Sequence, residues 1–209
     1  MNDELKFFRK MRFDYERRDF LRFLVETHGY NKYLEVGVLG EHLTFEHVPA
    51  PFKVGVDPVS GGTHRLTSDE FFAQNKENFD LIFVDACHHH ENVFRDVSNA
   101  LKCLRPGGTI ALHDCFPPTE QYERLEVCGT AWRAFSHFRQ DTSLDGAVGN
   151  FDYGVGVILR RPNSLPIKLP RPFRDLTYPE MIDHKDTWAR LMSVEELQTF
   201  CSKGEPCDK

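Results

Sequence analysis

The sequence lacks long hydrophobic runs, an excess of positive charge and a paired set of cysteines. No segment approaches the ~18 apolar residues of a membrane-spanning helix, and the charged N-terminus has no apolar run of the roughly 7–15 residues found in secretory leaders. The net charge of −6 disfavours a surface that neutralises nucleic-acid phosphates, and acidic residues interleave the basic residues at 9–18. We therefore expect a cytoplasmic protein that binds neither membranes nor nucleic acids.

The cysteine spacing predicts reduced thiols rather than a disulfide framework. A chain of 209 residues, 40% hydrophobic and 28% charged, can bury a sizeable core without disulfides. Two alternatives stay open around Cys87 and Cys115, a disulfide between them or a zinc site with the neighbouring histidines, although the spacing matches no common structural zinc pattern. The cysteines are Cys87, Cys103, Cys115, Cys128, Cys201 and Cys207.

Alternating apolar runs and glycine turns predict a doubly wound α/β fold with a mostly parallel sheet. The expected helices lie at 17–28, 93–104 and 130–138, and the expected strands at 33–36, 52–56, 80–85, 109–112 and 153–159, with a further short strand at 63–67. A capping box at Ser193 and Glu196 begins a last helix. We expect a helical segment at 1–30, a cofactor-binding domain at 31–160, and a proline-rich crossing with short helices at 161–209.

The segment 32–57 is the most informative part of the chain. It consists of a buried strand, a turn containing Gly37 and Gly40, and a second strand that ends at Asp57. Ligands of open α/β sheets bind at the carboxyl ends of the strands. Asp57 follows Gly37 by 20 residues, a spacing that places a carboxylate on ribose hydroxyls. The segment therefore predicts a site for a ribose-containing cofactor.

The glycine turn favours a sulfonium cofactor over a dinucleotide. It lacks the G-x-G-x-x-G pattern, because Val38 stands at the second glycine and Glu41 lies where a pyrophosphate needs neutral backbone. A carboxylate there repels a pyrophosphate but not a sulfonium, and Glu35 inside the apolar strand points the same way. A nicotinamide-dependent oxidoreductase remains the alternative from a different class of enzyme.

Six motifs in a fixed order resemble the class I S-adenosylmethionine-dependent methyltransferases. They are LEVGVLG at 34–40, VGVDP at 54–58, TSDEFF at 67–72, FDLIFVDACH at 79–88, LRPGGTIALHD at 104–114 and FDYGVGVI at 151–158. The resemblance implies a Rossmann-like fold, a seven-stranded sheet whose last strand is antiparallel, with helices on both faces. It also implies methyl transfer from S-adenosylmethionine to a small-molecule acceptor.

The same resemblance places the cofactor on named residues. The methionine part would lie near Glu35, Gly37, Val38, Gly40 and Asp85, the ribose on Asp57, and the adenine beside Ser68 and Asp69. Glu41 and His42 occupy a position where the family often has a third glycine. This departure keeps open the alternative of a methyltransferase-like domain that binds a cofactor or a partner without catalysing a reaction. A separate alternative is that Gly37 and Gly40 serve only as turn residues that adopt positive φ.

Two acids, Asp85 and Asp114, end neighbouring strands and should share one crevice with His88 and His113. Such a set suits a hard divalent cation such as Mg²⁺, which orients a hydroxyl and eases its deprotonation. His88 is then a candidate base near neutral pH. The alternative without metal is that Asp85 binds the cofactor's amino group and Asp114 caps the next loop.

The D-x-x-H and H-D pieces resemble metal-dependent O-methyltransferases that act on sugar hydroxyls of natural products. In that comparison Asp85 and Asp114 fall on metal ligands, His88 on a base, and His113 on a third ligand position that carries an acid in those enzymes. We therefore expect an acceptor such as a sugar or polyol hydroxyl.

Two segments are candidates for covering the site. The loop 116–128 follows the catalytic strand and is the best candidate for a substrate lid. The aromatic N-terminal residues Phe7, Phe8, Phe13 and Tyr15 are candidates for a second cover or for a homo-oligomer contact, with packing on the domain's own surface as the alternative.

Overall fold

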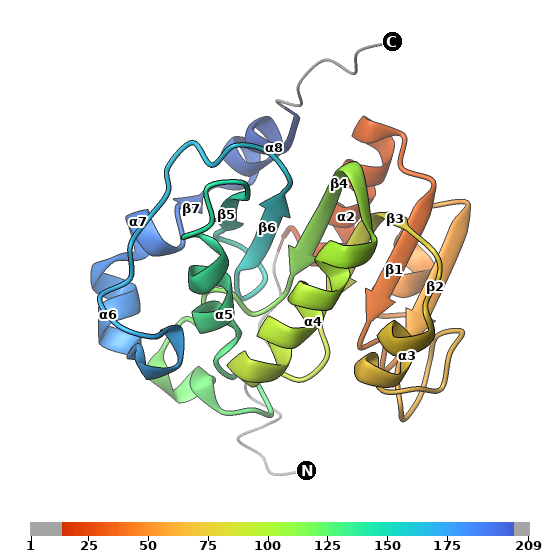
Figure 1. The fold of residues 1–209 in the computed structure, drawn as a ribbon, viewed down its shortest axis with the longest axis horizontal. Coiled ribbons are helices and arrows are strands. Elements are labelled where there is room, and N and C mark those ends of the chain that lie inside the picture. The colour runs from red at the N-terminus through yellow and green to blue at the C-terminus, as the bar shows by residue number, and fades with distance from the viewer. Residues whose placement is uncertain (1–13, 203–209) are drawn as a thin grey trace.

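A seven-stranded sheet forms the centre of the computed structural model, which describes residues 14–202 (Figure 1). The strand order is β2-β1-β3-β4-β6-β5-β7. The strands are β1 (Lys32–Val36), β2 (Phe52–Val56), β3 (Phe79–Val84), β4 (Leu104–Leu112), β5 (Asp145–Gly149), β6 (Val155–Leu159) and β7 (Leu191–Met192). All strands run the same way except β6, which is antiparallel to both β4 and β5.

The mostly parallel, seven-stranded α/β sheet is thus confirmed, but two details of the prediction were wrong. The reversed strand is β6 and not the last strand of the chain. The strand expected at 63–67 is reduced to one bridge between Val56 and His64. The carbonyl of Gly55 accepts the N–H groups of both Thr63 and His64, so the chain bends there instead of extending the ladder.

Helices cover both faces of the sheet, as expected (Figure 1). On one face lie α3 (Ser68–Gln74), α4 (His90–Cys103) and α5 (Ala131–Phe138), and on the other α2 (Arg17–His28) and α8 (Val194–Ser202). Alternate residues of the central strands enter the two cores: Leu34 and Ile82 face α4, whereas Tyr33 and Leu81 face α2. Strands buried on both faces explain the continuous apolar runs in the sequence.

The C-terminal segment packs against the same sheet. Its elements are η3 (Phe173–Asp175), α6 (Tyr178–Asp183) and α7 (Lys185–Trp188), which join Trp132 of α5 in a separate apolar cluster. The capping box is present, since the Ser193 N–H donates to Glu196 at 2.8 Å and the Glu196 N–H donates to Ser193 at 3.2 Å. The boundaries at 30 and 160 remain predictions.

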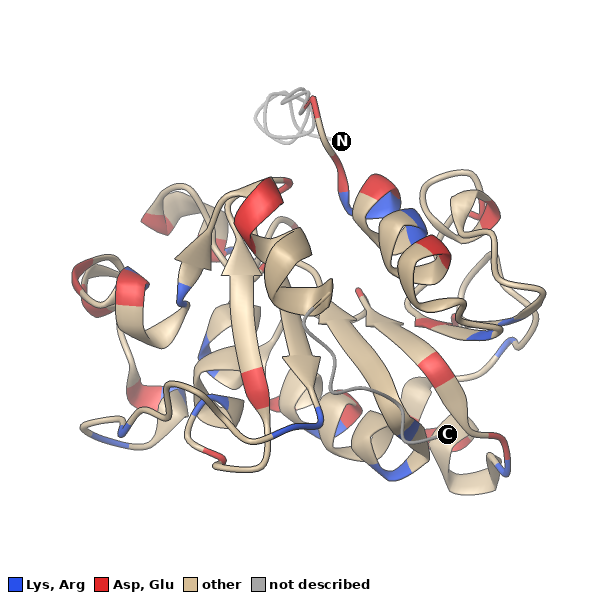
Figure 2. Cartoon of the chain, turned by 90° about the horizontal axis from the view of Figure 1, so that it is seen from above, with Lys and Arg blue, Asp and Glu red and all other residues tan. Residues whose placement is uncertain are grey.

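The N-terminal aromatic residues Phe7, Phe8 and Phe13 lie outside the described residues, whereas Tyr15 packs edge-on against Phe151 at a centroid distance of 5.1 Å. Figure 2 shows basic and acidic residues interleaved along α2, which follows the N-terminal segment. Between residues 14 and 202 no helix is long and apolar enough to span a bilayer.

Candidate active site

A cavity of about 1090 Å³ lies at the carboxyl ends of β1, β2, β3 and β4. Its volume lies just above the range of about 300–1,000 Å³ that is typical of small-molecule sites. The predicted site residues that line it are Glu35, Gly37, Val38, Asp57, Ser68, Asp69, Asp85, His88, His113 and Asp114. Gly40 does not line the cavity. The structure thus brings the remaining residues together, and their individual roles stay predictions.

Gly37 is required by the approach of two chain segments. Its φ is +93°, and a Cβ atom there would lie 2.3 Å from the carbonyl oxygen of Asp85. The end of β1 can therefore meet the loop after β3 only through a glycine. Gly40 has a weaker requirement, since its Cβ would meet the flexible ring of His42 at 2.9 Å.

Asp57 first organises the loop that follows β2. One carboxylate oxygen accepts the N–H groups of Val59 and Ser60 at 2.7 and 2.9 Å, and the other accepts that of Leu39 at 2.9 Å. A carboxylate offers about four acceptor positions. One acceptor position is therefore left for a further donor, and the predicted contact of Asp57 with the ribose hydroxyls stays a prediction.

Glu35 is a buried acid that has no cationic side chain at hydrogen-bond distance among residues 14–202. It is 2% exposed, and Oε2 accepts the hydroxyl of Tyr33 at 2.5 Å. Burial raises the pKa of Glu35 to about 8, although the Tyr33 hydrogen bond opposes the shift. A cation bound in the cavity would favour the ionised form, so Glu35 is suited to a positively charged ligand.

The predicted adenine end is formed by the start of α3 and the adjoining face of α4. Ser68 and Asp69 open α3 after the N-cap Thr67, and Asp69 pairs with Arg95 at 3.0 Å. Asp96, which the sequence did not single out, lines the same end and is 1% exposed. Burial raises its pKa to about 6.

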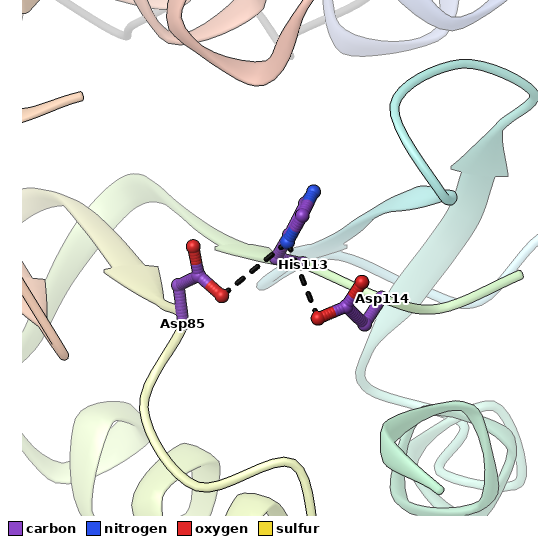
Figure 3. Close-up of side chains that lie close together, drawn as sticks. All are labelled: Asp85, His113 and Asp114. Atoms are coloured by element: carbon purple, nitrogen blue, oxygen red, sulfur yellow. Dashed lines mark ion pairs between the residues drawn. The ribbon is translucent and has the colours of Figure 1, made fainter. Parts of the chain in front are cut away.

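An acidic cluster forms where β3 and β4 end (Figure 3). Nδ1 of His113 lies 3.3 Å from Oδ1 of Asp85 and 3.3 Å from Oδ2 of Asp114. One ligand atom from each of these residues lies within 4.8 Å of the other two, a spacing compatible with one metal ion. Asp114 has a φ of +60°, so the cluster depends on a left-handed residue directly after His113.

His88 faces both carboxylates from the loop after β3, three residues beyond Asp85. Its Nε2 lies 3.6 Å from Oδ1 of Asp85 and 3.4 Å from Oδ2 of Asp114. Burial lowers the pKa of His88, but Asp85 and Asp114 outweigh burial and raise it to about 9. A base at neutral pH needs a free nitrogen, so this histidine can accept a proton only when another cation neutralises the carboxylates.

Arg17 and Asp152 belong to the cluster although the sequence analysis did not select them. Nη1 of Arg17 lies 3.0 Å from Oδ2 of Asp152, and its Nε lies 3.5 Å from Oδ2 of Asp85. Oδ1 of Asp152 lies 3.3 Å from Nε2 of His113. The only sequence signal for Asp152 is its position in the FDYGVGVI motif, and Arg17 had none beyond its place at a helix start.

The loop at 116–128 forms a wall of the cavity and is tied to α5, and its role as a substrate lid stays a prediction. It contains η2 (Glu120–Glu123), and Glu123 accepts the Trp132 indole N–H at 2.8 Å and an Arg133 N–H at 3.2 Å. Beyond the loop, the Thr130 N–H donates to the carbonyl of His88 at 2.8 Å. Glu126 and Val127 line the cavity from this wall.

The zinc and disulfide alternatives receive no support among residues 14–202. Cys87 and Cys115 are both free, and the candidate metal group found there contains no cysteine. His90 has a structural partner, because its Nδ1 lies 2.8 Å from the hydroxyl of Thr130. His89 caps α4, where its Nδ1 accepts the Glu91 N–H at 3.4 Å.

Comparison with known proteins gives a family match and a shared fold. Residues 15–115 match the family described as "Methyltransferase domain". No curated protein matches the chain. An O-methyltransferase from Bacillus cereus in complex with S-adenosylhomocysteine (SAH) has a TM-score of 0.53 at 16% identity, and the comparison covers 76% of this chain and 91% of that chain.

Two further solved structures share the fold. A putative O-methyltransferase from Klebsiella pneumoniae has a TM-score of 0.54 at 18% identity, covering 76% of this chain and 87% of that chain. A putative caffeoyl-CoA O-methyltransferase from Staphylococcus aureus has a TM-score of 0.55 at 11% identity, covering 76% of this chain and 93% of that chain. Identities this low establish the architecture and leave substrates to be argued from the site.

Proposed function

The chain resembles the class I S-adenosylmethionine-dependent methyltransferases in sequence and fold, and from that resemblance we propose that it transfers a methyl group from S-adenosylmethionine. The acceptor atom is an oxygen, in a hydroxyl group of a small polar molecule such as a sugar or polyol. The expected small-molecule acceptor, the cytoplasmic location and a homo-oligomer contact remain predictions from the sequence.

The observation that carries the proposal is the charge of the cavity. Nine acidic side chains line it against three guanidinium groups, and the excess of acids favours a cationic cofactor and disfavours a pyrophosphate even with Glu35 protonated in the ligand-free protein. The acidic side chains are those of Glu16, Glu35, Asp57, Asp69, Asp85, Asp96, Asp114, Glu126 and Asp152, and the guanidinium groups are those of Arg17, Arg18 and Arg95. This charge argues against the nicotinamide-dependent alternative.

The residues at the ends of β1 and β2 would bind the cofactor, and those at the ends of β3 and β4 would bind the acceptor. Glu35 at the end of β1 offers a desolvated carboxylate to the positive part of the cofactor, and Asp57 offers its remaining acceptor position to a ribose hydroxyl. The bound cofactor supplies an activated methyl group and its own leaving group. Asp85, Asp114 and His88 lie at the next two strand ends, where they would hold the acceptor hydroxyl and take its proton.

The residues at these strand ends also fit a divalent cation. The carboxylates of Asp85, Asp114 and Asp152 gather around His88, His113 and the guanidinium group of Arg17. A divalent cation that displaced the protons of the two histidines would balance the two negative charges that Arg17 leaves. Asp85, His113 and Asp114 would hold the ion. It would orient the acceptor and ease loss of its proton. Mg²⁺ is the ion expected from the carboxylates.

Calorimetric titration of S-adenosylhomocysteine tests the cofactor class, with NAD⁺ as the control ligand. We expect micromolar binding of S-adenosylhomocysteine and none of NAD⁺. A panel of polyols, sugars and catechols, incubated with methyl-labelled S-adenosylmethionine, then identifies the acceptor. Binding without transfer to any acceptor would favour the non-catalytic alternative, and absence of S-adenosylhomocysteine binding would contradict the proposed cofactor.

A further inference from the structure

We propose that Asp152 is a positioning residue that, anchored by Arg17, turns Nδ1 of His113 toward a bound divalent ion, and that the site prefers a transition-metal ion such as Mn²⁺, Fe²⁺, Co²⁺ or Zn²⁺ to Mg²⁺. The inference rests on the proposed function only through the shared site, because metal binding is measurable without cofactor or acceptor.

The surroundings of His113 fix the role of each ring nitrogen. The side chain is 8% exposed, and Nε2 faces Oδ1 of Asp152 at 3.3 Å. Among the described residues Nε2 makes no hydrogen bond, and the Asp152 carboxylate faces it as an ion-pair partner. Nδ1 faces Asp85 and Asp114 as an ion-pair partner (Figure 3). When a metal ion takes the place of the Nδ1 proton, a carboxylate behind Nε2 would keep the single N–H of the neutral imidazole on that side and leave the Nδ1 lone pair for the ion.

Asp152 is held in place by an unusual turn. Asp152, Tyr153 and Gly154 all have positive φ, of +43°, +61° and +88°. The turn is fastened to the segment after β4, because the N–H of Cys115 donates to the carbonyl of Gly154 at 2.8 Å and that of Phe116 to the carbonyl of Tyr153 at 2.9 Å. A strained turn clamped beside the cluster fits a positioning task.

Arg17 contacts one carboxylate oxygen of Asp152 and one of Asp85, so the other oxygen of each acid faces His113. Its backbone N–H and Nη1 both reach Oδ2 of Asp152, at 2.8 and 3.0 Å, so Oδ1 remains for His113. Its Nε lies on the Oδ2 side of Asp85, so Oδ1 of that residue remains beside Nδ1 of His113. Ligating histidines and carboxylates characteristically have such partners behind them.

The donor set decides the class of ion. One imidazole nitrogen and two carboxylate oxygens converge at the site. Mg²⁺ prefers oxygen ligands and retains its waters, whereas imidazole suits first-row transition metals, whose affinity rises from Mn²⁺ toward Cu²⁺. The imidazole of His113 therefore shifts the preference away from the Mg²⁺ that the carboxylates alone suggested.

The test is metal binding by the untagged full chain after treatment with a chelator. Co²⁺ is titrated by visible absorbance and Mg²⁺ by calorimetry, for wild type, Asp152→Asn and Asp145→Asn. Asparagine also adopts positive φ, so Asp152→Asn keeps the turn. Asp145 is the matched control, because it is 2% exposed, pairs with Arg161 and Arg190 at 3.0 Å, and lies at the opposite end of the sheet.

We expect wild type to bind Co²⁺ at least about tenfold more tightly than Mg²⁺. Asp152→Asn should weaken Co²⁺ binding about 10- to 100-fold, whereas Asp145→Asn should lower the melting temperature and leave Co²⁺ binding unchanged. Equal affinity for Mg²⁺ and Co²⁺, no metal binding by wild type, or an Asp152→Asn variant that binds Co²⁺ like wild type would each overturn the inference. The wild-type comparison holds even if a variant fails to fold.

Titration of S-adenosylhomocysteine into the same preparations separates the two proposals. Cofactor binding without metal binding leaves the proposed function standing and removes the metal site. Metal binding without cofactor binding supports the metal site and contradicts the proposed cofactor.

Discussion

Replacement of Asp114 by asparagine is expected to slow methyl transfer by about two to four orders of magnitude. Asp114 faces both histidines, with Oδ2 at 3.4 Å from Nε2 of His88 and 3.3 Å from Nδ1 of His113. The amide removes the negative charge that both imidazoles face. Asparagine tolerates a φ of +60°, so the backbone after β4 should keep its course.

The measurement is kcat with the acceptor identified in the labelling screen, together with the Kd of S-adenosylhomocysteine. Asp114 is not among the residues expected to touch the cofactor, so the Kd should change less than about threefold while kcat falls. Asp145→Asn serves again as the buried-carboxylate control and should retain kcat in the folded fraction. An Asp114→Asn enzyme with wild-type kcat would show that this carboxylate has no part in the reaction.

The elements that could be predicted from the sequence are those with a strong local signal. The strands β1, β2 and β3 are apolar runs bounded by turns, and α2 was predicted at its observed bounds. The strand β5 has no such signal, since Asp145–Gly149 contains two glycines and one β-branched residue. It is a strand because β6 and β7 pair with it on either side, and that pairing is set by tertiary structure.

In the candidate site, too, residues with a local sequence signal could be predicted and residues placed by tertiary contacts could not. Asp85 and Asp114 could be predicted because each directly follows a buried strand. Arg17 and Asp152 could not, because their contact joins residues 135 positions apart. The loop after β2 likewise folds back so that two of its N–H groups donate to the Asp57 carboxylate. The sequence pattern identifies Asp57 as a candidate but does not identify these hydrogen-bond partners.

Glutamine at position 35 is expected to stabilise the ligand-free protein at pH 8 by on the order of 2–4 kcal/mol. The pKa of Glu35 is raised by burial to about 8 in the folded protein, whereas the unfolded value is 4.5. Between these values the unfolded chain releases the proton and the folded chain retains it. The free energy of unfolding therefore falls as pH rises, by about 1.4 kcal/mol per pH unit.

The Glu35→Gln variant removes this loss while keeping an oxygen that can accept the Tyr33 hydroxyl. Urea unfolding at pH 5 and pH 8 measures the effect: the two proteins should differ little at pH 5, and the variant should be the more stable at pH 8. A variant less stable than wild type at pH 8 would show that Glu35 is ionised and compensated in the folded state.

The same substitution should weaken cofactor binding, which explains why a destabilising acid belongs at this position. S-adenosylmethionine carries a sulfonium charge that S-adenosylhomocysteine lacks, and both carry an amino group. If Glu35 faces the sulfonium, Glu35→Gln should weaken S-adenosylmethionine binding at least about tenfold and S-adenosylhomocysteine binding less. Equal losses for the two ligands would place Glu35 at the amino group, and unchanged affinities would remove it from the cofactor site. A gain in stability paired with a loss of affinity is the signature of a residue kept for binding.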